Sequence, residues 1–411
     1  MEIKERLDEL EQFAIEVILH NKPGITATLF RLFLHGLSFI YASVVRLRLK
    51  LYRERFIHDH HLGVPVISIG NLTVGGTGKT PVAELLARAL QKSGRSVAIL
   101  SRGYKSKRQK KVRIWTKWLA GLRGETLPTN PPRVVSDGKK VLLDSLVAGD
   151  EPYMLAKNLP GVPVVVDKDR VKAGLYAIER LGANTLLLDD GLQYIRLKHR
   201  MDMVLVDRTA PWGNGYLLPR GTLREPVRHL KRASFIFLTK CDGSDNSEFI
   251  KGLRKYNRVA EIIECRHRPL HLENIHTGER LPLDRLQGAY VGAVSGIAVP
   301  ESFESGLRLL GAKVDVVRRF ADHHRFTDKD ISQFIDRCVR RDVDLIVTTE
   351  KDYVRFPKLP PADVPIVFLR VEIEIMNGQH VFDRMIRILS EAKEVPTPVY
   401  GAEFVGATVE E

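Results

Sequence analysis

The sequence has few cysteines, and their positions exclude two classes of protein. Cys241, Cys265 and Cys338 are spread widely over a chain of 411 residues. A disulfide scaffold needs more cysteines, and a C-x-x-C metal site needs them closer together. We therefore expect a protein of a reducing compartment, with the cytoplasm as the expected side.

The sequence also lacks an uninterrupted apolar run long enough to cross a bilayer. Its most apolar stretch, residues 25–45, is interrupted by Arg31, which leaves 14 uncharged residues from Leu32 to Val45. A membrane span needs about 20 apolar residues, and the small-residue cleavage site of a signal peptide is missing. We expect neither a transmembrane helix nor a cleaved signal peptide.

Basic residues follow this apolar stretch directly, which is typical of a helix lying in the plane of a membrane interface. The alternative is a helix packed against the core of the protein itself. In the interfacial interpretation, aromatic side chains enter the acyl boundary and the bases reach lipid phosphates. The aromatic residues are Phe30, Phe33, Phe39 and Tyr41, and the bases are Arg46, Arg48, Lys50, Arg53 and Arg55.

Acidic residues are missing from residues 101–124, which hold nine bases. The whole chain carries 64 Lys+Arg against 50 Asp+Glu, a net charge of +14. Such a balance implies anionic partners: nucleic acid, phosphorylated metabolites or a lipid surface. No RNP, zinc-finger or helix-turn-helix signature is present, so we expect no nucleic-acid partner.

Trp115 and Trp118 among the bases indicate a segment at a headgroup layer, although an exposed hairpin would look similar.

A phosphate-binding loop follows a β-rich run at residues 64–69 and precedes a helical pattern that extends to Leu90. This is the context that a P-loop requires. Glycines let backbone N–H groups face the phosphates of a nucleotide, Lys79 would reach the β- and γ-phosphates, and Thr80 would ligate Mg²⁺. The usual first glycine is replaced by Thr73. We expect nucleotide contacts from Thr73, Val74, Gly75, Gly76, Thr77, Gly78, Lys79 and Thr80.

Further apolar runs predict a parallel β-sheet with helices on both faces, the α/β fold of a P-loop NTPase. Ligands of such sheets bind at the carboxyl ends of the strands. Asp189 and Asp190 follow one run and are expected to hold the Mg²⁺ of the nucleotide, although a plain turn or helix cap can also contain an Asp pair. The expected strands are residues 96–100, 162–166, 185–188, 203–206 and 235–238.

Two acidic motifs are candidates for the chemistry of phosphoryl transfer. Asp150, in Gly149-Asp-Glu-Pro152, could accept the proton of an attacking hydroxyl, or it could cap the helix that follows. Asp322-His323-His324 lies far along the chain, and His323 could orient or tune such a carboxylate. Without other context, a capping or surface Asp-His would be the simpler interpretation.

Two further motifs suggest contacts to a phosphorylated substrate. Leu223-Arg-Glu-Pro226 supplies a fork-shaped cation suited to phosphate, or alternatively an Arg–Glu surface pair of little energetic value. Ser101-Arg-Gly-Tyr104 follows the second expected strand, at the same edge of the sheet as the P-loop. We expect substrate contacts from Ser101, Tyr104, Arg224 and Glu225.

From about Leu29 to Phe382 the sequence resembles the tetraacyldisaccharide 4'-kinase family, the lipid A 4'-kinases of bacteria. The resemblance rests on the apolar basic stretch, on the motifs quoted above and on their order along the chain. Further matching motifs are Gly70-Asn71, Asp189-Asp-Gly-Leu-Gln193, Phe320-Ala-Asp-His323 and Thr349-Glu-Lys-Asp352.

The resemblance implies transfer of the γ-phosphate of ATP to the 4'-hydroxyl of an acylated glucosamine disaccharide 1-phosphate. The product would be lipid IVA, made at the cytoplasmic face of the bacterial inner membrane by a peripheral enzyme with no obligate protein partner. Asp150 would be the base and His323 its partner. The Mg²⁺ or water shell would comprise Thr80, Glu151, Asp189, Asp190 and Gln193. The family usually has His where this chain has Tyr194, which could at most donate a neutral hydrogen bond.

We expect two lobes joined by a hairpin, with Asp150 and His323 on different lobes, so that closure assembles the site and excludes water. Thr239-Lys-Cys-Asp242 resembles a guanine-selecting tetrapeptide, so the P-loop alone does not decide the nucleotide. The expected divisions are an acidic extension (1–21), the interfacial helix (22–56), the kinase core (57–268), the hairpin (269–285), a second lobe (286–400) and a tail (401–411).

Overall fold

The computed structural model describes residues 13–18, 22–103 and 130–392. The acidic extension, the basic tryptophan segment and the C-terminal tail therefore lie wholly or largely outside the described residues, as does Tyr104.

A 13-stranded sheet runs through both halves of the chain, in the order β11-β10-β12-β13-β8-β7-β6-β1-β5-β2-β4-β3, with β9 paired to β8. The expected parallel strands are confirmed: β1 lies between β5 and β6, β2 between β5 and β4, and β7 between β6 and β8. The bounds in this half are β1 Val66–Asn71, β2 Val97–Ser101, β3 Arg133–Ser136, β4 Val164–Val166, β5 Thr185–Asp189, β6 Met201–Asp207, β7 Phe235–Thr239 and β8 Glu261–Asn274.

Helices cover both faces of this half of the sheet, because alternate residues of each strand point to opposite sides. Ile67 and Leu187 pack against α3, α6 and α12, whereas Val66 and Leu186 pack against α7. The bounds are α3 Lys79–Lys92, α5 Ser145–Ala148, α6 Asp150–Asn158, α7 Arg170–Leu181, η1 Val227–Arg232, α8 Ser247–Arg254 and α12 Gln379–Ser390. We call this half, with α12, the first lobe.

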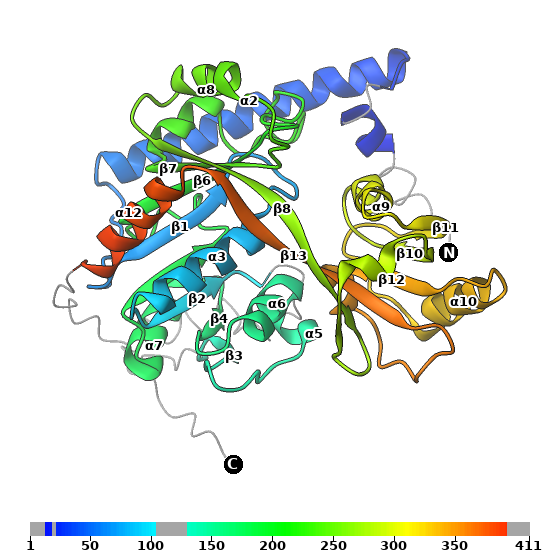
Figure 1. Cartoon of the computed structure of the whole chain (residues 1–411). Helices are drawn as coiled ribbons and strands as arrows, with labels where there is room; N and C mark the ends of the chain where they lie inside the picture. The colour runs from blue at the N-terminus through cyan, green and yellow to red at the C-terminus, as the bar shows by residue number, and fades with distance from the viewer. Residues whose placement is uncertain (1–12, 19–21, 104–129, 393–411) are drawn as a thin grey trace.

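The second lobe has its own cores around β10, β11 and β12, with α9 and α10 packed on them. It contains β9 Arg280–Leu281, η2 Leu283–Leu286, β10 Tyr290–Ser295, α9 Pro300–Leu309, β11 Lys313–Arg319, α10 Asp328–Val339, β12 Leu345–Thr349 and α11 Glu350–Tyr353. β8 and β13 (Ile366–Asn377) form a long antiparallel ribbon that passes from one lobe to the other (Figure 1).

The expected hairpin at residues 269–285 is present, since Leu272 pairs with Leu281 across β8 and β9. The end of the chain differs from the expected second lobe of residues 286–400. β13 carries the chain back along β8, and α12 then packs its Phe382 and Met385 into the core that the first lobe builds around β1, α3 and α6. A strand of 12 residues spans about 40 Å, which is enough to return the chain to the first lobe.

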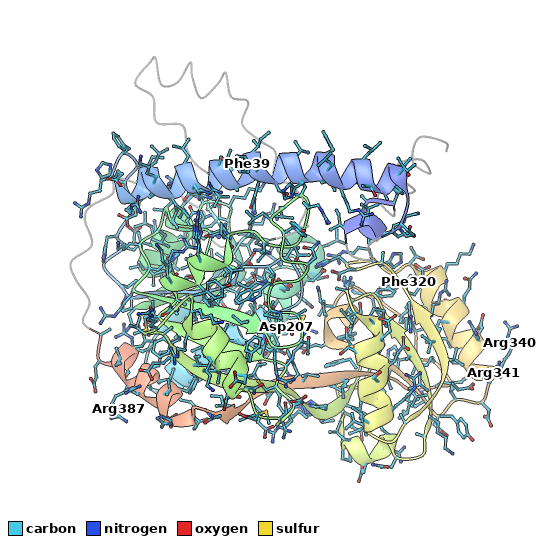
Figure 2. All side chains as sticks on the ribbon, turned by 90° about the horizontal axis from the view of Figure 1, so that it is seen from above. Phe39, Asp207, Phe320, Arg340, Arg341 and Arg387 are labelled. Carbon is cyan, nitrogen blue, oxygen red and sulfur yellow. The ribbon has the colours of Figure 1, made fainter. Side chains whose placement is uncertain are left out.

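α2 (Ile25–Arg53) is one helix of 29 residues that lies along the first lobe, with Phe39 on it (Figure 2). Ala27, Leu34, Ser38 and Ala42 are buried, and the remaining apolar side chains are largely exposed. The helix is longer than the uncharged run predicted, because it continues through the bases that follow. By length and composition alone it could cross a membrane.

Two of the aromatic residues expected in a lipid layer make contacts within the protein. The Tyr41 hydroxyl donates a hydrogen bond to the Arg224 carbonyl at 2.9 Å, so this side chain faces the protein. The Phe30 ring packs against Phe13, with 5.7 Å between ring centroids. Phe33 and Phe39 are 61% and 68% exposed, so the outward face of α2 presents fewer aromatic rings than the sequence suggested.

Candidate active site

The P-loop connects the buried end of β1 to the start of α3. Gly78 caps the helix with φ of +83°, a left-handed conformation that favours glycine. The side-chain amide of Asn71 donates to Thr77 Oγ1 at 2.9 Å, and the backbone amide of Val74 donates to the Thr222 carbonyl at 2.7 Å. These contacts fix the loop at both ends.

The middle of the loop is open, in the way that a phosphate-binding cradle requires. A Cβ atom added at Gly75 or Gly76 would meet no atom within 4 Å. The N-terminal end of α3 faces the same place, and unpaired backbone N–H groups at a helix N-terminus attract anions. The predicted cradle of residues 73–80 is thus arranged to receive phosphate groups.

Lys79 extends from the first turn of α3 between the loop and the end of β5. Its ammonium lies 3.4 Å from Asn71 Oδ1 and 3.6 Å from Asp190 Oδ1. Its side chain is only 12% exposed. A cation held by two weak contacts at the mouth of a P-loop can pair with a phosphate with little rearrangement.

Asp189 is the last residue of β5 and is buried, with Oδ1 lacking a hydrogen-bond partner in the described structure. Its Oδ2 accepts a hydrogen bond from Ser101 Oγ at 3.3 Å. Burial, followed by the neighbouring charges of Glu151 and Asp190, raises the pKa of Asp189 to about 7. A buried carboxylate oxygen without a donor, beside two other carboxylates, is an arrangement that a cation would stabilise.

Asp190 follows with φ of +53°, which is unusual for a residue other than glycine. Both of its oxygens accept hydrogen bonds from Arg224 Nη1 at 2.7 Å. Burial acts to raise the pKa of Asp190, but Lys79 and Arg224 outweigh it and hold the pKa below its usual value. Asp190 is therefore a carboxylate at neutral pH.

Gln193 lies between the P-loop strand and Arg224. Its amide donates to the Asn71 carbonyl at 3.1 Å, and its Oε1 lies 3.4 Å from Arg224 Nη1. Among the described residues, no three His, Cys, Asp or Glu side chains are placed to hold a metal ion by themselves. A cation here would need ligands from a bound nucleotide and water as well, which is usual for Mg²⁺.

Asp150 and His323, which are 173 residues apart in the sequence, meet at the boundary between the lobes. His323 Nδ1 lies 3.1 Å from Asp150 Oδ2. Burial acts to raise the pKa of Asp150, but His323, Arg355 and Arg325 together lower it. His323 has φ of +63°, and such strained residues cluster at functional sites.

Three further residues at this boundary were not assigned roles from the sequence. Lys351 Nζ lies 3.4 Å from His323 Nε2, 3.6 Å from Asp322 Oδ1 and 4.0 Å from Glu151 Oε1. Arg325 and Arg355 contact Asp150 itself. The Thr349-Glu-Lys-Asp352 motif directly after an apolar strand was a signal for Lys351, whereas no spacing pattern connects Arg325 or Arg355 to Asp150.

The predicted substrate residues are placed differently from one another. Arg224 joins several parts of the site, because its amide also donates to the Leu72 carbonyl at 2.7 Å. Glu225 is 3% exposed, and its carboxylate accepts hydrogen bonds from Arg232 at 2.7 and 2.8 Å and lies 2.8 Å from His229 Nδ1. Ser101 is also buried and donates to Asp189. Glu225 and Ser101 thus support other side chains of the protein.

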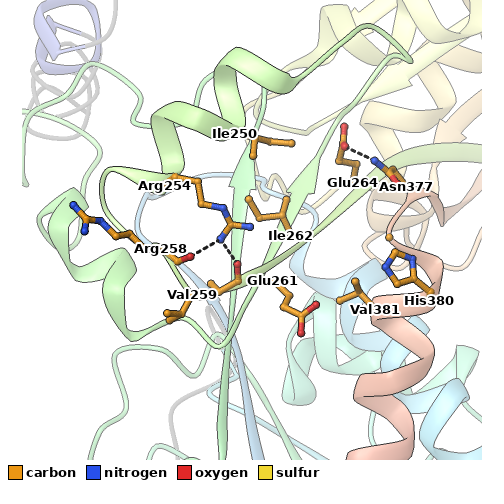
Figure 3. A pocket seen from close by; sticks show the side chains of 12 residues that line it. Ile250, Arg254, Arg258, Val259, Glu261, Ile262, Glu264, Asn377, His380 and Val381 are labelled. Carbon is orange, nitrogen blue, oxygen red and sulfur yellow. Dashed lines mark hydrogen bonds between the residues drawn. The ribbon is translucent and has the colours of Figure 1, made fainter.

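A separate cleft of about 360 Å³ lies between α8, the start of β8 and α12 (Figure 3). Three of its charged side chains are already engaged: Arg254 donates to the Arg258 and Ala260 carbonyls, Glu261 pairs with Arg384, and Glu264 accepts from Asn377 at 2.9 Å. None of the catalytic motifs lines this cleft. The residues suited to phosphoryl transfer are those between the P-loop and His323.

Comparison with known proteins agrees with this geometry. The family model LpxK, tetraacyldisaccharide-1-P 4'-kinase, matches residues 30–119 and 122–390. The tetraacyldisaccharide 4'-kinase of Syntrophus aciditrophicus is 37% identical over 367 residues, which cover 87% of this chain and 92% of that protein. The chain belongs to the tetraacyldisaccharide 4'-kinase family.

Other relatives extend this result. The tetraacyldisaccharide 4'-kinase of Anaeromyxobacter sp. strain Fw109-5 is 39% identical over 331 residues, covering 80% of this chain and 83% of that one. The crystal structure of LpxK from Aquifex aeolicus in complex with ATP matches with a TM-score of 0.65 and 28% identity. It covers 88% of this chain and 99% of the solved chain. The activity of this chain is therefore that of a tetraacyldisaccharide 4'-kinase.

The hydroxyl of Tyr194, the residue for which the resemblance implied a histidine, is engaged within the protein. It donates to Asp169 Oδ1 at 3.1 Å and accepts a hydrogen bond from the Arg170 amide at 3.0 Å. The Arg170 guanidinium lies 4.9 Å from the centre of the Tyr194 ring. The tyrosine hydroxyl thus pairs with a carboxylate and a backbone amide, and it holds the start of α7.

Proposed function

We propose that the enzyme transfers the γ-phosphate of ATP to the 4'-hydroxyl of tetraacyldisaccharide 1-phosphate and so forms lipid IVA. The kinase activity follows from the family, and ATP is the nucleotide bound in the Aquifex aeolicus relative. The observation that carries the proposal is the position of the Asp150–His323 pair on the side of the P-loop where Glu151, Asp189 and Asp190 gather.

The region after β7 supports ATP rather than a guanine-selecting site. A guanine-reading aspartate must offer both carboxylate oxygens to the base. Asp242 Oδ1 instead accepts hydrogen bonds from the Ser244 amide and hydroxyl at 3.1 and 2.6 Å, and its Oδ2 accepts from Arg208 at 3.2 Å. The resemblance of residues 239–242 to the guanine-selecting tetrapeptide therefore does not extend to the side-chain contacts of Asp242.

In the proposed reaction, Asp150 accepts the proton of the 4'-hydroxyl while the hydroxyl oxygen forms a bond to the γ-phosphorus of ATP. The bond from the γ-phosphorus to the bridging oxygen of the β-phosphate breaks, and ADP leaves. His323 fixes the orientation of the Asp150 carboxylate, and its own position is set by the hydrogen bond from its amide to the Gly296 carbonyl at 3.2 Å. Lys79 and Arg224 neutralise the negative charge of the transferring phosphate. Phosphoryl transfer depends mainly on such positioning and charge neutralisation.

The donor set also fits Mg²⁺, which nucleotide-dependent kinases use to offset phosphate charge. Asp189 supplies a buried oxygen without a donor, and the neighbouring carboxylates of Glu151 and Asp190 would add hard oxygen ligands if the cation were bound. The Thr80 hydroxyl, in the first turn of α3, would be the further protein ligand. Gln193 would belong to the surrounding shell, because its side chain contacts Asn71 and Arg224.

We also infer that α2 lies in the plane of the inner membrane, at its cytoplasmic face. Hydrogen bonds hold the helix on the first lobe at three successive positions: Ser38 donates to the Leu217 carbonyl at 2.8 Å, Tyr41 to the Arg224 carbonyl at 2.9 Å, and Arg48 to the Gln193 carbonyl at 3.2 Å. A helix tied to the protein along its length is favoured to lie on a bilayer rather than to cross it. This orientation brings a membrane lipid substrate close to Arg224.

Incubation with γ-labelled ATP tests the proposed function. Detergent-dispersed tetraacyldisaccharide 1-phosphate should become labelled, and RNA added instead should neither become labelled nor stimulate phosphate release. Nucleic-acid-stimulated ATP hydrolysis without lipid labelling would overturn the proposal.

A further inference from the structure

Arg325 lies in the loop between β11 and α10 of the second lobe and reaches across to the first lobe. Its Nη1 donates to Ser145 Oγ at 3.0 Å, and its Nη2 donates to the Ser145 carbonyl at 2.9 Å and to Asp150 Oδ1 at 3.1 Å. All three acceptors are in α5 or at the start of α6. The guanidinium therefore bridges the two lobes at the candidate base. Figure 1 shows α5 and α6 on the side of the first lobe next to the second lobe.

Arg355 also approaches Asp150, with 3.7 Å between Nε and Oδ2, but its hydrogen bonds serve its own lobe. It donates to Asp352 Oδ1 at 2.5 Å, to the Gly296 carbonyl at 3.1 Å and to the His324 carbonyl at 3.2 Å. Its side chain is fully buried. Arg355 thus stabilises the second lobe, whereas the side chain of Arg325 is 38% exposed and its hydrogen bonds reach the opposite lobe.

His323 and Arg325 together fix both oxygens of the Asp150 carboxylate. His323 engages Oδ2, and Arg325 engages Oδ1. A carboxylate oxygen has two lone pairs, so Oδ1 keeps one for the acceptor hydroxyl while Arg325 occupies the other. The plane of the carboxylate, and hence the direction of the free lone pair, depends on where Arg325 is held.

We propose that Arg325 is a positioning residue, a clamp between the lobes that orients Asp150 when the second lobe is seated on α5. The proposal rests on the proposed role of Asp150 as the base. According to this proposal, turnover depends on Arg325. Nucleotide binding does not depend on Arg325, because the nucleotide-binding residues 73–80, Lys79 among them, belong to the first lobe. ATP binding and the orientation of the Asp150 carboxylate then depend on different contacts.

Kinetic constants of Arg325→Met and Arg325→Lys test this clamp. Displacement of a reacting group by about 1 Å can cost roughly 100-fold, so we expect Arg325→Met to lower kcat by about 10- to 100-fold. KM for ATP should stay within about twofold, since the P-loop is untouched. Lysine keeps one charged donor and should restore part of kcat. Arg319, which pairs with Glu301 and Glu304 inside the second lobe, provides a matched control: Arg319→Met should keep the wild-type kcat.

A double-mutant cycle with Asp150→Asn separates a clamp on the base from general damage. If Arg325 acts through Asp150, then Arg325→Met should lower the residual rate of Asp150→Asn very little. The clamp would be overturned if the losses of kcat from the two substitutions multiplied, or if Arg325→Met kept the wild-type kcat. Neither result would affect the proposed function, because the wild-type enzyme would still phosphorylate the lipid. Absence of lipid phosphorylation by the wild-type enzyme would instead contradict the proposed function.

Discussion

At the residue scale, the charged groups of the site differ in how many hydrogen-bond and ion-pair partners they have within the protein. Asp189 keeps an oxygen without a donor, whereas both oxygens of Asp190 accept hydrogen bonds from Arg224 and one lies 3.6 Å from Lys79. The two adjacent carboxylates therefore differ in pKa, one raised and one lowered. Divergent pKa values in neighbouring groups are typical of sites that bind charge.

Lys79→Ala tests the phosphate cradle. Removing a charge-assisted contact to phosphate costs about 1.5–3 kcal/mol, so KM for ATP should rise roughly 10- to 100-fold while the protein stays folded. The exposed Lys92, at the other end of α3, provides the control, because Lys92→Ala should leave KM unchanged. Equal KM values for the wild type and Lys79→Ala would show that the cradle does not bind the nucleotide.

Glu225→Gln tests whether Glu225 stabilises the fold or binds substrate. Burial acts to raise the pKa of Glu225, but His229 and Arg232 lower it overall. A lowered folded pKa contributes stability above the pKa of the unfolded chain, and this contribution is lost as the pH falls through the folded pKa. Breaking one side of a buried pair costs about 3–5 kcal/mol, so urea denaturation at pH 7 should show a loss of this order.

That difference in stability should begin to shrink as the pH falls below about 4, the pKa of an unperturbed Glu, and should continue to shrink as the pH falls toward the lower pKa of the folded carboxyl. KM for the lipid should stay at its wild-type value in the Glu225→Gln enzyme. A raised lipid KM together with unchanged stability would instead return Glu225 to the substrate contacts predicted from its motif.

At the element scale, sequence patterns were sufficient for the strands and the P-loop, because these depend on local periodicity and glycine spacing. The parallel strands at 185–188, 203–206 and 235–238 are all present. The pattern was insufficient for α2, because apolar residues on a helix do not reveal which side meets the protein. Tyr41 was assigned to lipid, yet it donates to the Arg224 carbonyl.

Replacing Leu32 and Phe39 by Glu tests the outward face of α2, where these side chains are 68% exposed. Burying such side chains in an interface contributes about 1.5–3 kcal/mol each, so binding to vesicles that contain anionic lipid should weaken at least about tenfold. Leu309, 89% exposed on α9, provides the control: Leu309→Glu should bind as the wild type does. Unchanged flotation of the Leu32/Phe39 variant with vesicles would contradict the interfacial placement.

At the scale of the whole molecule, the long β8–β13 ribbon places His323 beside Asp150 although a separate hydrophobic core supports each lobe. The resemblance to the family identified this pair, because both residues lie in recognisable motifs. Arg325 and the return of α12 to the first lobe were not predicted. They depend on how two lobes pack, and contacts between segments so distant in sequence leave no periodic signal in one chain.

The most direct test of the account is to measure turnover and ATP binding together in Asp150→Asn. Asparagine keeps the size of the side chain but cannot accept the proton of the 4'-hydroxyl. General base catalysis contributes about 10²- to 10⁴-fold, so kcat for phosphorylation of tetraacyldisaccharide 1-phosphate should fall by this factor while the Kd for ATP stays within about twofold. A kcat near the wild-type value would contradict the assignment of Asp150 as the base.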